Sequence, residues 1–234
     1  MPKKYKAILA IFVIFLALGV GVFLSYQYQT VIREDLGEME RTEETEPEAA
    51  PETLEWDDIF YGEEDGVIKL AVTGTENDRL LSEDHPSRPK ISPQGSYLSY
   101  IAPSEWEQVG SLYKYDLTED DIVTLVEGAD LPEQHTVKDF WWLDESTLLF
   151  IGGFAYGTVS VGGSLYGLDL ETEQIVEIFA QTERSEVKNI EIIEEEEQVL
   201  LEIAEFDEDF IEHEVINEYI ELNYVYEQVG SPEQ

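Results

Sequence analysis

The feature that most constrains the fold of this chain is an internal repeat of about 50 residues. The segment GSLYKYDL at residues 110–117 recurs as GSLYGLDL at residues 163–170, an offset of 53. Two further matches have an offset of 50, and they pair Ser96–Ile101 with Ser146–Ile151 and Val137–Asp139 with Val187–Asn189. A repeat of this length, with about four short strands, has the size of one propeller blade. The repeat therefore predicts an all-β, propeller-like array of four-stranded sheets.

The apolar stretches after Trp56 are short, rich in Tyr, Val and Ile, and separated by Gly, Pro, Asp and Ser. This pattern is typical of strands joined by turns. The predicted strands are Val67–Val72, Tyr97–Ile101, Ser111–Leu117, Ile122–Leu125, Thr147–Ile151, Ser164–Leu170, Ile175–Phe179, Val199–Ile203 and Tyr219–Tyr226. One segment is ambiguous: residues 191–214 contain twelve acidic residues and no base, and their apolar positions fit a helix nearly as well as strands.

Two segments carry a resemblance to a known family. Residues 90–100, KISPQGSYLSY, resemble the S-P-D-G hairpin of TolB-like propeller repeats, and Ser111–Leu117 resembles the L-Y-x-x-D-L strand that follows it. Gln94 stands where the family has Asp, and the second unit replaces the motif by LDES at 143–146. The resemblance covers about residues 88–179, with a weak third copy after Glu186, and it extends to membrane-anchored domains of Bacillus-type bacteria. It implies a fold and no particular activity.

The number of repeats leaves two arrangements open. At about 50 residues per unit, the 179 residues from Trp56 to Gln234 hold three to four units. One arrangement is a small four-bladed propeller, in which strands around Ile59–Val72 and Tyr219–Tyr226 share a blade. The other is an open stack of sheets.

The N-terminus predicts a membrane anchor. Ala7–Leu24 is an 18-residue run without charge, close to the minimum that crosses a hydrocarbon core of about 30 Å. The three lysines of MPKKYK precede it, so the N-terminus is expected inside and the remainder outside. We predict a cytoplasmic tail over 1–6 and a transmembrane signal-anchor over 7–26. The alternative is a cleaved signal peptide, although FLSYQ at 23–27 lacks a small-x-small site.

Acidic residues dominate the segment between the anchor and the repeats. Arg33–Glu55 contains ten carboxylates, two arginines and two prolines, without apolar periodicity. Mutual repulsion would keep such a segment extended. We therefore predict a disordered acidic stalk over 27–55 and an extracytoplasmic β-repeat domain over 56–234.

The charge and the absence of cysteine exclude several classes of function. The 13 Lys and Arg residues face 53 Asp and Glu residues, a formal charge of −40, and there is no cysteine. Nucleic-acid binding requires a basic face, while disulfides and Cys-ligated metals require cysteine. The 43% hydrophobic content is nevertheless sufficient for a folded core. We predict no cofactor and no dedicated metal site, with weak binding of divalent cations by the carboxylates.

Five aromatic residues are candidates for contact with a ligand or partner. Phe154 and Tyr156 lie in a glycine-rich segment bracketed by Gly152-Gly153 and Gly162-Gly163, which is either a mobile surface or a bulged hairpin. The other three candidates are Trp106, Trp141 and Trp142. An exposed Trp could stack on a sugar ring, whereas a buried one would fill the core between blades.

These observations favour a non-catalytic, membrane-anchored domain with a binding, sensory or scaffold role at the cell envelope. The expected partner is an envelope or membrane protein. The alternative is a hydrolase of envelope glycans or peptides that uses a carboxylate pair, such as Asp116 with Glu119 or Asp207 with Asp209.

Overall fold

The computed structural model describes residues 54–64, 67–73, 78–156 and 160–230. The chain divides into two units, residues 1–50 and 51–234, and every described residue lies in the second unit. The predicted tail (1–6), the predicted transmembrane helix (7–26) and the predicted stalk up to residue 53 lie outside the described residues. None of the helices in the described ranges is both long enough and apolar enough to cross a membrane.

The described residues form four antiparallel sheets, each built from strands that are consecutive in the chain. The first sheet contains β1 (Ile59–Glu64), β2 (Val67–Val72) and β3 (Arg79–Ser82). The second contains β4 (Lys90–Ile91), β5 (Tyr97–Ala102), β6 (Ser111–Asp116) and β7 (Asp121–Val126). The third contains β8 (His135–Trp142), β9 (Thr147–Phe154), β10 (Ser164–Asp169) and β11 (Gln174–Phe179). The fourth contains β12 (Ser185–Ile193), β13 (Gln198–Phe206) and β14 (His213–Glu221).

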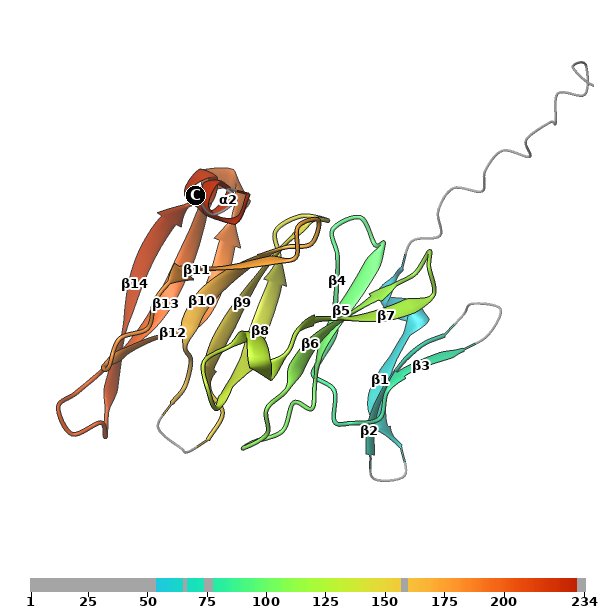
Figure 1. Ribbon diagram of the computed structural model, residues 1–234, viewed down its shortest axis with the longest axis horizontal. Coiled ribbons are helices and arrows are strands. Elements are labelled where there is room, and N and C mark those ends of the chain that lie inside the picture. The colour runs from blue at the N-terminus through green and yellow to red at the C-terminus, as the bar shows by residue number, and fades with distance from the viewer. Residues whose placement is uncertain (1–53, 65–66, 74–77, 157–159, 231–234) are drawn as a thin grey trace, which may run out of the picture. The chain divides into compact units, whose positions relative to one another are not determined.

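Short helices complete the described chain. The 3-10 helices are η1 (Trp56–Asp58), η2 (Gly128–Asp130) and η3 (Glu194–Glu196), and the α-helix is α2 (Leu222–Val229). Eight of the nine predicted strands are present, with ends that differ by up to three residues. Figure 1 shows the sheets following one another in a row, from β1–β3 to β12–β14.

The third sheet is buried on both faces because it lies between two others. Along β9, Leu148 and Phe150 belong to an apolar cluster shared with the second sheet, whereas Leu149 and Ile151 belong to a cluster shared with the fourth. Successive strand residues point to opposite faces, so this alternation places one sheet on each side. Burial of each of these leucines contributes about 2 kcal/mol. This explains why β9 is apolar along nearly its whole length.

The second sheet is likewise packed on both faces. Leu98 and Tyr100 contact the first sheet, while Ile101 and Leu112 contact the third. The rings of Tyr100 and Tyr113 stack with their centroids 5.4 Å apart. The three apolar clusters of the described residues therefore join neighbouring sheets in chain order, and none of them joins the first sheet to the fourth.

This arrangement is the open stack, the second of the two predicted alternatives. The shared blade is wrong: β2 pairs with β1 and β3 in the first sheet, and β14 pairs with β13 in the fourth. The two outer sheets have three strands within the described residues, whereas the two inner sheets have four.

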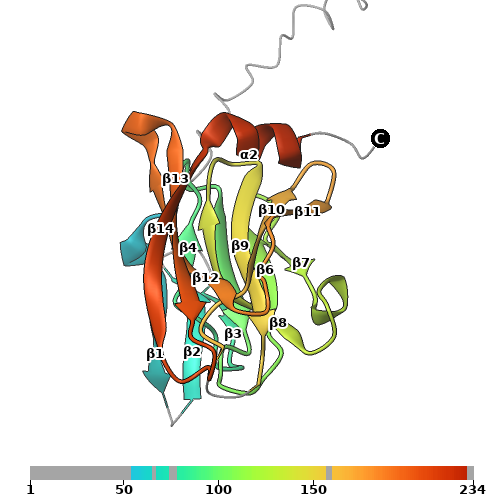
Figure 2. The same cartoon turned by 90° about the vertical axis from the view of Figure 1, so that its left-hand side faces the viewer.

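The predicted strand Tyr219–Tyr226 is also wrong, because the strand ends at Glu221 and helix α2 begins at Leu222. Val225 and Val229 are spaced by one helical turn and are both buried against the third and fourth sheets. Tyr224 and Tyr226 remain exposed, so they do not form the buried face of a strand. Figure 2 shows α2 lying at one end of the sheets.

Helix α2 also explains a departure from the repeat. Gly167 stands where the first repeat has Lys114, and a Cβ at Gly167 would overlap the side chain of Val229. A larger residue would therefore prevent α2 from packing on the third sheet.

The ambiguous acidic segment 191–214 is β-structure. Val199, Leu201 and Ile203 are buried at alternate positions of β13, against the third sheet. The run of glutamates forms only η3, and Glu197 ends it in the left-handed conformation (φ 53°). Burial of the alternating apolar residues therefore outweighs the helix propensity of glutamate.

The glycine pairs form a close crossing of two strand ends. A Cβ at Gly153 would overlap the carbonyl of Gly162, and one at Gly163 would overlap the carbonyl of Gly152. Gly163 also exchanges two backbone hydrogen bonds with Val187, at 3.0 and 2.8 Å, in an isolated bridge to β12. The glycines thus allow the chain to link the third sheet to the fourth.

We predict that Gly163→Ala lowers the free energy of unfolding by about 2–3 kcal/mol, because a methyl group has no space at this crossing. Urea denaturation of the full chain measures the change. The control is Gly62→Ala on β1, where the nearest atom, Cζ of Phe60, is 3.6 Å from the added Cβ. The control should change stability by less than about 0.5 kcal/mol. Equal effects of the two substitutions would contradict the proposed role of the crossing.

Candidate functional site

Phe154, Tyr156 and His135 form the most distinct aromatic group on the surface of the third sheet. We call these three residues the aromatic surface. Phe154 and Tyr156 are 37% and 38% exposed, and their rings meet edge to face with centroids 5.8 Å apart. His135 pairs with Phe154 across β8 and β9, and their ring centroids are 6.2 Å apart. The structure therefore brings two of the predicted contact residues together and adds His135.

Hydrogen bonds fix the ring of His135. Its Nδ1 lies 3.1 Å from the carbonyl oxygen of Glu133, and its Nε2 lies 3.4 Å from the amide nitrogen of Gln181. Both ring nitrogens of His135 therefore have a polar partner within the fold. The backbone of Ala155 also donates to Gln134 at 2.9 Å. This network holds the aromatic surface in place.

A second set of hydrogen bonds holds the C-terminal part of the glycine-rich segment. The carboxylate of Glu186 accepts hydrogen bonds from the backbone of Val161 and Gly162, both at 2.9 Å, and from the Ser160 hydroxyl at 3.2 Å. Three donors on one carboxylate make a strong local tie. Residues 160–162 are therefore bound to β12, which supports the bulged-hairpin alternative there; residues 157–159 lie outside the described ranges.

The three tryptophans have different environments. Trp142 is buried at 9% exposure and stacks on Tyr97 with centroids 5.9 Å apart, so its ring fills the core between the second and third sheets. That position corrects the prediction of Trp142 as a contact residue. Trp141 is half-buried beneath the ammonium of Lys90. Trp106 is 69% exposed in the connection between β5 and β6, apart in sequence from the aromatic surface.

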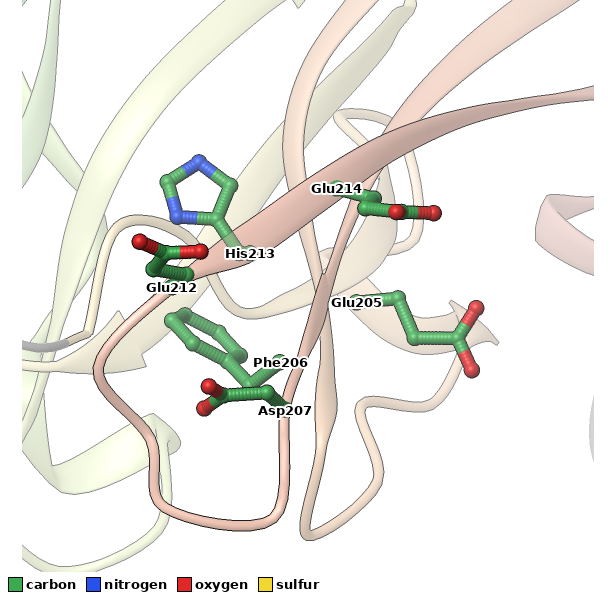
Figure 3. Close-up of a pocket in the computed structure, with 6 residues that line it drawn as sticks. All are labelled: Glu205, Phe206, Asp207, Glu212, His213 and Glu214. Carbon is green, nitrogen blue, oxygen red and sulfur yellow. The ribbon is translucent and has the colours of Figure 1, made fainter.

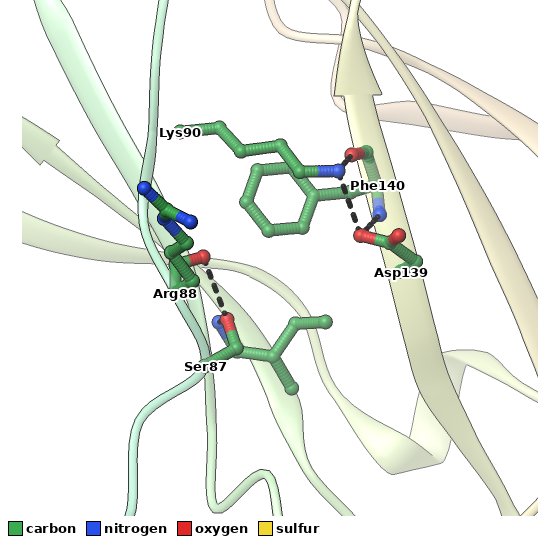
Figure 4. A network of polar contacts seen from close by, with 6 residues as sticks. Ser87, Arg88, Lys90, Asp139 and Phe140 are labelled. Atoms are coloured by element: carbon green, nitrogen blue, oxygen red, sulfur yellow. Dashed lines mark hydrogen bonds and ion pairs between the residues drawn. The ribbon is translucent and has the colours of Figure 1, made fainter. Parts of the chain in front are cut away.

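Lys90 ties the second sheet to the third, as Figure 4 shows. Its ammonium lies 2.7 Å from Oδ1 of Asp139, also donates to the carbonyl of Phe140, and sits 4.3 Å from the ring centroid of Trp141. The Lys90 ammonium is thus matched by a carboxylate, a carbonyl and an aromatic face. No local sequence pattern marks this lysine, because its partners are 49 to 51 residues away.

A cavity of about 380 Å³ lies between the outer strands of the second and third sheets. Its apolar lining comes from Val123 and Leu125 on one side and from Leu168, Leu170 and Ile175 on the other. Lys114, Asp130 and Glu173 add charges at this cavity. The lining of this cavity is more polar than apolar, so it lacks the mainly apolar composition that is typical of a small-molecule site.

A second cavity, of about 340 Å³, lies at the β13–β14 hairpin and is lined by acidic residues (Figure 3). The ring of His213 contacts that of Phe206 at a tilt of 53°, with centroids 5.3 Å apart, and Figure 3 shows the His213 ring and Glu214 leaving opposite sides of the strand. Across the ranges that the structure describes, no group of three or more His, Asp or Glu residues is placed to hold a metal ion.

One carboxylate of each predicted hydrolytic pair is engaged in a turn. Oδ1 of Asp116 accepts hydrogen bonds from the backbone of Thr118 and Glu119, and Asp169 forms the same turn one repeat later. Oδ1 of Asp207 accepts from the backbone of Ile211 at 2.9 Å. The repeated Asp therefore has a local structural role in both units.

Asp144 links the third sheet to α2. Burial alone would raise the pKa of this carboxyl, but hydrogen bonds from Ser146, Tyr226 and Thr147 outweigh burial and hold the pKa below its usual value. The Ser146 backbone and hydroxyl lie 2.7 and 2.9 Å from Oδ1. Ionised Asp144 thus stabilises the turn and the end of the helix together.

We predict that Asp144→Ala lowers the free energy of unfolding by about 1–2 kcal/mol at pH 7, a value that allows for solvent screening. Because the folded-state pKa is depressed, the contribution is complete above the usual Asp pKa of about 4 and is lost as the pH falls below it. Urea denaturation at pH 7 and pH 3 measures the difference.

The matched control is Asp121→Ala, since Asp121 is exposed and its side chain has no hydrogen bond within the described ranges. It removes the same charge and should have little effect at either pH. If Asp144→Ala lowers the free energy of unfolding equally at pH 7 and pH 3, ionisation of Asp144 does not contribute to stability.

The stacked antiparallel sheets define the class of this protein as an all-β, propeller-like domain. A family model described as Domain of unknown function (DUF4652) matches residues 102–221, just over half of the chain. The chain belongs to that family. The match spans the third and fourth sheets and strands β6 and β7 of the second. A search of the curated proteins finds no match.

Several solved structures resemble the chain. A candidate conserved lipoprotein from Clostridium novyi NT has 24% identity and a TM-score of 0.52, over 58% of this chain and 87% of that one. The β-propeller domain of the Trilobed protease from Pyrococcus furiosus has 17% identity and a TM-score of 0.42, over 69% and 48%. TolB from Acinetobacter baumannii has 15% identity and a TM-score of 0.35, over 61% and 35%. The likeness to the Clostridium protein is one of fold.

Proposed function

We propose that this chain is a non-catalytic, membrane-anchored, extracytoplasmic domain that binds a partner at the cell envelope through the aromatic surface. The role is that of a binding, sensory or scaffold module. Its repeats are TolB-like in this proposal, as the hairpin and strand motifs of the first repeat indicate.

The observation that carries the proposal is the exposure of Phe154 and Tyr156 on a fixed support. Aromatic side chains lose little conformational entropy on binding, and they are enriched among the residues that dominate interface energies. His135 and Phe154 come from paired strands, and the hydrogen bonds to Gln181 and Glu133 hold His135 in place. The surface is thus organised before a partner arrives, which lowers the cost of binding.

The envelope location is supported by the sequence and by one relative. The uncharged segment 7–24 follows three lysines, a pattern that orients the remaining chain outward. The Clostridium novyi protein is described as a candidate lipoprotein. Since these 234 residues contain no cysteine for a lipid, we propose that the segment 7–26 provides the attachment in this chain.

The test is in-cell crosslinking of the full-length protein with the double variant Phe154→Ser and Tyr156→Ser. We expect a specific adduct with an envelope or membrane protein for the native chain, and about a tenfold or greater loss of that adduct in the variant. The control is Tyr219→Ser with Tyr224→Ser, which removes two other exposed rings, 55% and 46% exposed, at the fourth sheet and α2. The control should retain the adduct.

An adduct that survives loss of Phe154 and Tyr156 would show that the contact lies elsewhere. If no protein is recovered and the purified chain instead retains or cleaves envelope glycans, the protein-partner proposal fails. The glycan-binding or hydrolase alternative would then be favoured.

A further inference from the structure

The basic residues of this acidic protein divide sharply by their contacts. Eight Lys and Arg residues lie in the described ranges. Five of them bind a carboxylate or a carbonyl within the fold: Lys69, Arg79, Lys90, Lys114 and Arg184. The side chains of the other three, Arg88, Lys138 and Lys188, form no ion pair or hydrogen bond with any described residue. Three unpaired cations are unexpected where carboxylates are in such excess.

The three unpaired bases are spaced by the repeat. Arg88, Lys138 and Lys188 are each 50 residues apart. Lys138 lies on β8 and Lys188 on β12, which are edge strands of the third and fourth sheets. Arg88 lies two residues before β4, an edge strand of the second sheet, where Ser87 already donates a hydrogen bond to Ile101 of β5. We call these three residues the basic row.

Two of these bases occupy the same local geometry. The pairing of β8 with β9 shifts register between Val137 and Asp139, which makes Lys138 the extra residue of a β-bulge. The pairing of β12 with β13 shifts in the same way between Val187 and Asn189, at Lys188. Bulges commonly redirect a side chain near a functional site. The repeat therefore presents a base at the same position of successive sheets.

Contacts between the edge strands place the segments that carry these bases next to one another. Lys90 on β4 reaches Asp139 on β8, as Figure 4 shows, and this figure also places Arg88 beside Lys90. Lys138 on β8 is attracted by Glu186 on β12. Stacked sheets lie about 10 Å apart, so equivalent positions on successive sheets are expected at roughly that spacing.

Lys138 is poorly compensated within the fold. The side chain is half-buried, and this burial lowers its pKa, while the charge of Glu186 acts in the opposite direction. Glu186 itself accepts three hydrogen bonds from residues 160–162. A half-buried cation that attracts a carboxylate but forms no ion pair with it is costly, and an anionic ligand would lower that cost.

We propose that Arg88, Lys138 and Lys188 form a binding site for a linear phosphate polymer that runs across the second, third and fourth sheets. A polymer with a charge on every repeat can contact all three bases at once. Lysine binds phosphate oxygens as a compact point charge, and the guanidinium of arginine can bind two oxygens of one phosphate group, so both residue types of the row suit this ligand. The carboxylates elsewhere on the domain repel a polyanion, and so restrict it to the basic row.

The test measures the affinity of the full chain, in detergent micelles, for medium-chain inorganic polyphosphate as a function of salt. The variant is Arg88→Gln, Lys138→Gln and Lys188→Gln together. We expect the affinity to fall about 30-fold at an ionic strength of about 50 mM, and the slope of log K against log salt to decrease by about two. The control is Lys69→Gln, Arg79→Gln and Lys114→Gln, which makes the same charge change at ion-paired bases. It should lower the affinity less than about threefold.

Failure of the native chain to bind polyphosphate, or equal losses in the two triple variants, would overturn the proposed site. Equally tight binding of polyglutamate would overturn the phosphate class. Thermal melting checks that each variant is folded. If the row variant is unfolded, Lys188→Gln alone, at an exposed residue, should still lower the affinity about threefold. No change in that single variant would also contradict the proposal.

Discussion

Face-to-face packing of neighbouring sheets is the interaction on which the rest of this structure depends. The third sheet has one face against the second and one against the fourth, with Phe150 and Leu149 pointing to opposite sides of the same strand. An apolar sheet face must be buried against another element, and here the neighbouring sheets provide that cover. Lys90, the Gly163 crossing and the buried valines of α2 add specific ties between sheets that are already held by apolar contact.

Much of the fold could be predicted from the sequence because the repeat and the alternation are local signals. The strands around Leu112 and Leu165 follow from matching segments 53 residues apart, and the propeller-like fold is confirmed. The helix at Leu222–Val229 could not be predicted, because its burial depends on Gly167 in a different repeat. Trp142 could not be told from Trp141 by periodicity alone, since one of two adjacent rings must face inward and only the neighbouring sheet decides which.

The surfaces that remain accessible suggest how the domain is used. The exposed rings of Phe154 and Tyr156 meet edge to face at the end of β9. A second accessible feature lies along the sheet edges. The repeat places basic residues there at 50-residue intervals: Arg88, Lys138 and Lys188. Sequence comparison within the chain had aligned Val137–Asp139 with Val187–Asn189, but only the pairing of the strands shows that the shared lysine is a bulge residue.

The proposed role at the cell envelope requires that the sheets lie on the extracytoplasmic side of the membrane. The native chain has no cysteine, so single-cysteine variants can be labelled without background. The most direct measurement is labelling of intact cells with a membrane-impermeant maleimide, using Thr118→Cys, at an exposed turn of the second sheet, and Pro2→Cys, before the lysine cluster. We expect Thr118→Cys to be labelled in intact cells and Pro2→Cys to be labelled only after permeabilisation. Protection of Thr118→Cys until the cells are lysed would contradict the extracytoplasmic location.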